Sequence, residues 1–204
     1  MLEELYLKNA LIPKRYLTDP TEFVPSKLDK KCFKELQLIE SDIKSFVDNG
    51  NNLLIYSENF GNGKTTWSIK LLKAYIKAVG NYSFTYSTPA IFININNFIN
   101  EKKLSINDKN LEEKVRDIER KILSAKLVVF DDIGDKTLSE YDKSLMYYWI
   151  EYRTANMKSS IYTTNQSLDE LENSLGGKTY SRVVNYSIVK EFVSRLDRRS
   201  GGDE

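Results

Sequence analysis

The chain has 204 residues, 41% hydrophobic and 29% charged, and its net charge of +1 gives no overall basic field that would favour nucleic acid. A single cysteine and the lack of histidine exclude a disulfide framework, a cysteine-based metal site and histidine-dependent nucleophiles. Because no apolar run approaches the roughly 20 residues of a membrane span and the acidic N-terminus is unlike a signal peptide, we expect a cytoplasmic protein without membrane contact.

The first 28 residues are polar and carry three of the four prolines, namely Pro13, Pro20 and Pro25. Because proline interrupts regular structure, residues 1–28 are predicted to be a leader with little helix or strand. The chain length suits one domain with a sizeable core, and we place that domain at residues 29–204.

The rest of the chain alternates apolar runs with stretches of helical periodicity. In chain order, the predicted elements are a helix over residues 29–48, a strand over 52–56, a helix over 64–79, a strand over 89–94, a helix over 111–122, a strand over 127–130, a helix over 139–155, a strand over 160–164, a short helix over 168–175 and a strand over 187–193. Strands that alternate with helices predict an α/β fold in which a parallel sheet lies between two layers of helices.

Residues 57–66, SENFGNGKTT, nearly spell the phosphate-binding loop G-x-x-x-x-G-K-[ST], between a predicted strand and a predicted amphipathic helix. In such a loop the backbone amides and the helix N-terminus face phosphate oxygens. We expect ATP and Mg²⁺ as ligands, with Lys64 reaching the β- and γ-phosphates and the Thr65 hydroxyl ligating Mg²⁺. The predicted nucleotide-contacting residues are Asn59, Phe60, Gly61, Asn62, Gly63, Lys64, Thr65 and Thr66.

Glu58 stands where the motif has its first glycine. A side chain at this strand exit can point to solvent, at the cost of backbone strain or of repulsion towards the triphosphate. The alternative interpretation is a Gly-Asn-Gly turn followed by an ordinary helix. The order of strand, loop and helix favours the nucleotide site.

The apolar run LVVF leads directly into Asp131 and Asp132, the pattern of a Walker B segment. Asp131 would hold Mg²⁺, and Asp132 would orient or activate the attacking water. Asp132 is one methylene shorter than the glutamate of many P-loop ATPases, which leaves the hydrolysis rate open. Asn165 ends the next strand, where its amide would bridge the water and the γ-phosphate. The alternatives are a solvated aspartate pair and, for Asn165, a cap of the following helix.

With these motifs in place, the chain resembles AAA+ ATPases of the DnaC/DnaI helicase-loader family, including the IstB transposition ATPases, from about Leu11 to the C-terminus. The matching segments are LIPKRY, FGNGKTT, LVVFDDIG, IYTTNQSLDEL, TYSRV and FVSRLDRRSG. The resemblance implies an α/β P-loop NTPase of the AAA+/ASCE type. Its expected form is a three-layer sandwich with a parallel five-stranded sheet and little or no helical lid.

The resemblance also implies roles for arginines near the C-terminus. Arg182, in a segment expected to form an exposed loop, would be the arginine finger that contacts a neighbouring subunit's γ-phosphate. A finger is useful only in a self-associating protein. Arg198, or its neighbour Arg199, would be a sensor 2-like arginine. The alternative is a solvated basic tail.

The function implied by the resemblance is an ATP-hydrolysing helicase loader or remodeller of DNA replication that assembles on single-stranded DNA. The expected partner is a replicative helicase or a host helicase loader. We expect a version that lacks the N-terminal helicase-binding domain of the loaders, and the AT-rich residue usage suggests a phage or mobile-element protein.

Single-stranded DNA would contact Phe98, Lys102 and Lys103. The aromatic ring would stack on bases, and the basic groups would contact phosphates. The alternative for this segment is a solvated loop with one buried phenylalanine. Two other functions are also compatible with the sequence. One is a non-hydrolysing protein that inhibits a host helicase loader or helicase, and the other is an IstB-like transposition regulator.

Overall fold

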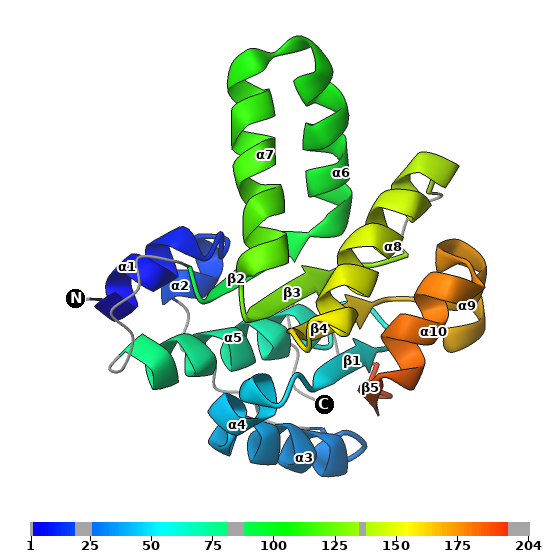
Figure 1. Cartoon of the computed structure of the whole chain (residues 1–204). Helices are drawn as coiled ribbons and strands as arrows, with labels where there is room; N and C mark the ends of the chain where they lie inside the picture. The colour runs from blue at the N-terminus through cyan, green and yellow to red at the C-terminus, as the bar shows by residue number, and fades with distance from the viewer. Residues whose placement is uncertain (1, 19–25, 81–87, 135–137, 196–204) are drawn as a thin grey trace.

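The computed structural model describes residues 2–18, 26–80, 88–134 and 138–195 (Figure 1). Within them, five parallel strands form one sheet in the order β2-β3-β4-β1-β5. The strands are β1 (Asn52–Tyr56), β2 (Ala90–Asn94), β3 (Leu127–Asp131), β4 (Ser159–Thr164) and β5 (Ser187–Glu191). Each overlaps a strand predicted from the sequence, and the predicted α/β fold with a five-stranded parallel sheet is confirmed.

Helices cover both faces of the sheet. One layer contains α1 (Leu2–Asn9), α2 (Arg15–Thr18), α3 (Lys30–Ser41), α4 (Ile43–Asp48) and α5 (Lys64–Gly80). The other contains α6 (Ile95–Leu104), α7 (Lys109–Ser124), α8 (Glu140–Ala155), α9 (Leu168–Leu175) and α10 (Gly177–Asn185). Figure 1 shows α6 and α7 as a hairpin that projects from the sheet, with α8 between this hairpin and α10.

Alternate side chains of the inner strands enter the two halves of the core. Leu53 and Ile55 of β1 pack with the first layer of helices, whereas Leu54 between them packs with the second. This alternation follows from the period of two residues in a strand. Because both faces are covered, the inner strands β1 and β3 are near-continuous apolar runs, which is why the sequence predicted them so directly.

The leader was predicted to have little regular structure, and this was wrong for its described part. Tyr6 and Ala10, one helical turn apart, are buried where α1 packs along α5. The Ala10 carbonyl also accepts a hydrogen bond of 2.8 Å from the Phe92 amide of the edge strand β2. The leader therefore covers a sheet edge and part of the core. Pro13 lies between α1 and α2, and Pro20 and Pro25 lie outside the described residues.

The predicted helix over residues 29–48 is divided in the structure, because Asp42 leaves helical geometry between α3 and α4. Apolar residues keep helical spacing across this break, so periodicity alone could not locate it. Two further helices were missed. Helix α6 follows β2 directly, and α10 occupies the GGKTYSR segment that was expected to be an exposed loop.

The carboxyl ends of the strands meet at one edge of the sheet, as parallel strands require. This edge carries the loop after β1, Asn94 at the end of β2, Asp131 at the end of β3 and Asn165 after β4. A capping box opens α8, where Ser139 and Asp142 satisfy each other's backbone amides. No helix in the described ranges has the length and apolar character to cross a membrane.

Candidate nucleotide-binding site

The loop between β1 and α5 has the backbone geometry of a phosphate cradle. Gly61 and Gly63 adopt φ of 71° and 101°, in the left-handed region that favours glycine. The loop is held from inside, since the buried Asn62 amide donates to Ser57 Oγ at 2.6 Å and the Asn59 N–H donates to the same oxygen at 3.1 Å. The loop is therefore fixed by its own polar side chains.

Lys64 opens α5 with its side chain turned into the loop. Its Nζ donates to the carbonyl oxygens of Asn59 at 2.8 Å and Ser57 at 3.2 Å, and the residue is only 5% exposed. A buried ammonium group among backbone carbonyls is well placed to compensate an anion held by the same loop.

Glu58 does not strain this loop. Among the described residues, positive φ outside glycine occurs only at Leu11, Asp132 and Met157. The Glu58 side chain is exposed to solvent. Backbone strain, one of the two costs expected from the missing glycine, is therefore absent here.

Asp131 is buried and receives two hydroxyl groups on one carboxylate oxygen. Thr65 Oγ1 donates to Oδ1 at 2.8 Å, and Thr163 Oγ1 donates to the same atom at 2.7 Å. Thr65 and Asp131, both predicted as magnesium ligands, are thus brought into direct contact from two different strand–helix units.

Asp132 has both carboxylate oxygens fixed by amides. Asn165 Nδ2 donates to Oδ1 at 3.1 Å, and Asn94 Nδ2 donates to Oδ2 at 3.2 Å. The Asp132 backbone is left-handed, with φ of 57°, and its N–H donates to Thr163 Oγ1 at 3.1 Å. Aspartate is among the residues that adopt this uncommon conformation most readily.

Three residues near these groups were not predicted from the sequence. Asn94 contacts both carboxylates, because its Nδ2 also lies 3.4 Å from Asp131 Oδ2. Thr163 contacts Asp131, and Tyr16 of the leader lines the hollow formed by residues 61–66. A polar residue ending the apolar run PAIFIN was the available signal for Asn94.

Arg182 lies on α10, away from these carboxylates. Its Nε and Nη2 donate to the two carboxylate oxygens of Glu151 on α8, at 2.5 and 3.4 Å. This hydrogen-bonded cation holds the pKa of Glu151 below its usual value. The structure therefore does not bring Arg182 together with the other predicted catalytic residues of its own chain. Arg198 and Arg199 lie outside the described residues. The expectation of little or no helical lid concerns the chain beyond β5, and most of that segment also lies outside the described residues.

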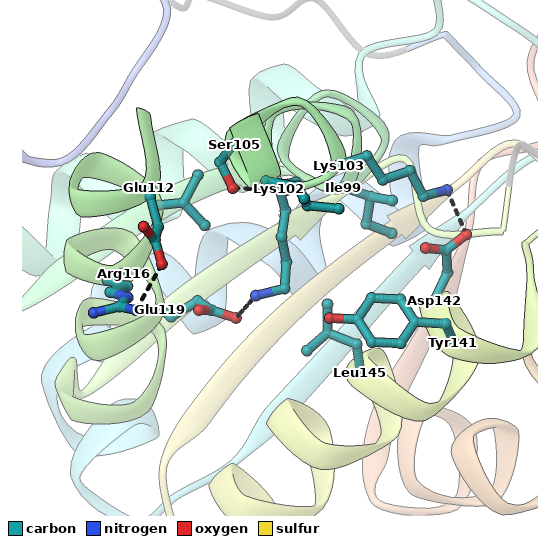
Figure 2. Close-up of a pocket in the computed structure, with 12 residues that line it drawn as sticks. Ile99, Lys102, Lys103, Ser105, Glu112, Arg116, Glu119, Tyr141, Asp142 and Leu145 are labelled. Atoms are coloured by element: carbon teal, nitrogen blue, oxygen red, sulfur yellow. Dashed lines mark hydrogen bonds and ion pairs between the residues drawn. The ribbon is translucent and has the colours of Figure 1, made fainter. Parts of the chain in front are cut away.

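The predicted DNA-contacting segment is helical and largely engaged within the protein (Figure 2). Phe98 is buried against Trp149, with ring centroids 5.5 Å apart, so it is unavailable for base stacking. Lys102 and Lys103 form ion pairs of 2.8 Å with Glu119 and Asp142, beside a cavity of about 510 Å³ between α6, α7 and the start of α8. The Lys103 side chain is still 50% exposed.

The site fits Mg²⁺ and a nucleotide phosphate chain. Thr65 and Asp131 present a hydroxyl and a carboxylate oxygen side by side, and Mg²⁺ prefers oxygen ligands. In the described ranges, no group of three or more Asp, Glu, His or Cys residues could form a metal cage. A site with few protein ligands is typical of Mg²⁺ that is shared with substrate phosphates.

Comparisons with known proteins agree with this geometry. A family model described as IstB-like ATP binding protein matches residues 3–190. None of the curated protein sequences matched the chain. Among solved structures, the chain is similar to a crystal structure of the DnaC helicase loader, with a TM-score of 0.72 and 23% identity over 88% of this chain and 99% of that chain.

Two further solved structures share the fold. A crystal structure of DnaI matches with a TM-score of 0.65 and 15% identity, over 91% of this chain and 94% of that chain. The replication initiator DnaA bound to AMPPCP and single-stranded DNA matches with a TM-score of 0.61 and 15% identity, over 83% of this chain and 48% of that chain. At these identities the likeness shows the fold, which is that of an α/β P-loop NTPase.

Proposed function

This chain belongs to the IstB-like ATP binding protein family, and from that premise we propose that it binds ATP with Mg²⁺ and hydrolyses it slowly. The observation that carries the proposal is the contact of Thr65 with Asp131, next to a carboxylate of Asp132 that two amides hold in place. The resemblance to DnaC, DnaI and IstB proteins that the motifs predicted is confirmed by the family match and the shared fold.

Each predicted contact residue has a role in this proposal. Residues 59–66 would hold the phosphates through the loop amides and the ammonium of Lys64. Thr65 and Asp131 would hold Mg²⁺, which neutralises phosphate charge when it is bound. These are the roles expected from the sequence, and the polar contacts around Asp131 and Lys64 support them.

Asp132 would orient the attacking water and accept its proton. Amide donors from Asn94 and Asn165 fix the direction of its carboxylate. Its side chain is one methylene shorter than the glutamate of many P-loop ATPases, so we expect slow turnover. Asn165 would also contact the γ-phosphate.

At the level of the cell, we propose a cytoplasmic helicase loader or remodeller of DNA replication, in a phage or mobile-element version. It would act on a replicative helicase or a host helicase loader. Support comes from the fold shared with the DnaC helicase loader and with a DnaA bound to single-stranded DNA. Single-stranded DNA is the proposed ligand of the assembled protein. Because Phe98 is buried, the DNA bases would have to stack on other aromatic side chains, such as the exposed Tyr141 beside the cavity of Figure 2.

Self-association would complete the site. Arg182 is partly exposed on α10 and contacts Glu151 of its own chain, so we propose that it acts as a finger on the nucleotide of a neighbouring subunit. A sensor 2-like role of Arg198 or Arg199 stays a prediction.

The family match also favours a second function, an IstB-like transposition regulator. Co-purification from cells separates the two functions. A replicative helicase or its loader in the purified complex supports replication, and a transposase supports the second function.

Turnover of ATP, measured with and without single-stranded DNA and helicase, tests the enzymatic part. If wild-type protein binds ATP without turning it over under any of these conditions, the non-hydrolysing inhibitor replaces the ATPase proposal.

A further inference from the structure

Arg182 and Glu151 form a contact between two neighbouring helices of the second layer. Glu151 belongs to α8 and Arg182 to α10, and the two helices pack side by side (Figure 1). The Arg182 guanidinium carbon also lies 5.4 Å from the ring centroid of Tyr186, just after α10. The cation is therefore held between a carboxylate and an aromatic ring of its own chain.

The geometry of this contact is that of a guanidinium fork on a carboxylate. Two nitrogens of Arg182 face the two oxygens of Glu151, and the side chains are 31% and 36% exposed. A guanidinium group binds phosphate oxygens through the same pair of donors. A carboxylate and a phosphate therefore compete for Arg182, because both need the same nitrogens.

We propose that Glu151 is a positioning residue that keeps Arg182 on its own subunit until a nucleotide bound to a neighbouring subunit displaces the carboxylate. This inference rests on the proposed finger role of Arg182. A γ-phosphate carries more charge than the Glu151 carboxylate, so it displaces that carboxylate from Arg182 when ATP is bound to the neighbouring subunit. The pairing thus sets how much ATP is needed before subunits engage each other.

A partly exposed pair of this kind is weak enough to be exchanged. Exposed ion pairs contribute little because water and salt screen them, and two-point arginine pairs lie at the upper end of that range. Loss of the Glu151 charge is therefore expected to lower the ATP concentration for half-maximal assembly and turnover by roughly three- to ten-fold.

The test compares Glu151→Gln with wild-type protein. Glutamine keeps the size of the side chain and removes its charge. Assembly is followed by sedimentation with ATP or AMPPCP, and turnover is followed over a range of ATP concentrations. Glu140→Gln is the matched control, because Glu140 lies on the same helix, is 91% exposed and pairs only with Lys143 in the described contacts.

The expected result is a lower half-maximal ATP concentration in Glu151→Gln, with unchanged nucleotide affinity of the dilute, unassembled subunit and no change in Glu140→Gln. A merely structural role of Glu151 would change thermal stability without changing that concentration. Glu151→Ser serves as a second variant if the glutamine variant unfolds.

Arg182→Ala distinguishes a failure of the proposed finger role of Arg182 from a failure of the proposed positioning role of Glu151. If this variant assembles and turns over ATP as wild-type protein does, Arg182 is not a finger and the proposed function fails at that point. If Arg182→Ala is impaired but Glu151→Gln needs as much ATP as wild-type protein, or more, the finger stands and the inference about Glu151 is wrong.

Discussion

Thr65 and Asp131 are 66 positions apart in the chain, yet Thr65 Oγ1 donates a hydrogen bond of 2.8 Å to Asp131 Oδ1. The contact joins the first turn of α5 to the end of β3 across the carboxyl edge of the sheet. It places one oxygen from each of two motifs where a single cation can touch both. Binding of Mg²⁺ and nucleotide is therefore the first property to test.

We predict that ATP with Mg²⁺ raises the thermal stability of the protein, because a ligand that binds the native state adds RT ln(1 + [L]/Kd) to its stability. At a ligand concentration about 100-fold above Kd this amounts to about 2.7 kcal/mol. Lys64→Ala should abolish the shift, since the loop loses its only buried ammonium among the described residues. Differential scanning fluorimetry checks this, and an equal shift in both proteins would contradict the phosphate-loop assignment.

Turnover should depend on the charge of Asp132. Asp132→Asn keeps the shape of the side chain and one of the two oxygens that accept from Asn94 and Asn165, but it removes the negative charge that orients water. We expect turnover to fall by at least about 100-fold, with the nucleotide-dependent thermal shift retained. A steady-state phosphate-release assay measures this. Unchanged turnover in the variant would assign the activating role to another residue.

Arg153 offers a test of the fold that is independent of nucleotide. It is fully buried and donates to the carbonyls of Ile122 at 2.7 Å and Ala125 at 2.9 Å, at the end of α7, and to Ser160 Oγ at 2.9 Å. Burial lowers its pKa to about 10, so it remains charged at neutral pH.

Arg153→Met would leave these buried acceptors without donors. We expect a loss of about 3 kcal/mol or more in the free energy of unfolding, which corresponds to a fall of roughly 6–12 °C in Tm. The control is Lys158→Met, because Lys158 donates to Ser124 at the end of the same helix from a more exposed position. If the two variants have the same Tm, the buried hydrogen bonds of Arg153 do not account for the stability of the contact between α7 and β4.

Stability should also depend on the pH through Asp142. Burial alone would raise the pKa of this carboxyl, but hydrogen bonds from Lys103 and Ser139 hold it below its usual value. A carboxyl with a lowered pKa stabilises the fold above its unfolded-state pKa of about 3.9, and this contribution is lost as the pH falls through the folded-state pKa.

Asp142→Ala should therefore reduce stability at pH 7 by about 1–3 kcal/mol, since it removes both a helix cap and an ion pair. The difference from wild-type protein should shrink below about pH 4. Urea unfolding at several pH values measures both quantities. A difference that does not depend on pH would mean that the cap, and not the charge, carries the effect.

Local signals in the sequence predicted much of this molecule. Strands β1, β2 and β3 are nearly uninterrupted apolar runs, and the phosphate loop and Asp131-Asp132 follow β1 and β3 directly. Those motifs needed no knowledge of the strand order. Asn94 was missed because its contact with the aspartates depends on β2 lying beside β3, in a register that pairs Asn94 with Asp131.

Helix α10 was missed for a different reason. Its start at Gly176-Gly177 is typical of a loop, and Gly176 indeed has φ of 77° at the end of α9. Only Thr179 and Val183, one turn apart, are buried in α10, and Tyr180 and Val184 beside them are partly buried against the core. The Arg182–Glu151 pair depends on the packing of α10 against α8, so no local pattern could have predicted it.

The last prediction concerns whether Arg182 acts between subunits. Arg182→Ala should leave ATP binding by the isolated subunit nearly unchanged, because Arg182 contacts Glu151 and Tyr186 and not the phosphate loop. It should impair nucleotide-dependent assembly and hydrolysis, since an arginine finger contributes on the order of 10³-fold or more to phosphoryl transfer.

Mixing two inactive variants gives the sharper measurement. A Lys64→Ala subunit keeps Arg182 but cannot hold ATP, whereas an Arg182→Ala subunit holds ATP but lacks the finger. If Arg182 acts on the neighbour, their mixed assembly contains sites with a nucleotide on one subunit and an arginine from the other, and part of the turnover returns. The control is each variant alone at the same total concentration. No recovery, in mixtures shown by sedimentation to contain both variants in one assembly, would mean that Arg182 acts within its own chain or only stabilises the contact between α8 and α10.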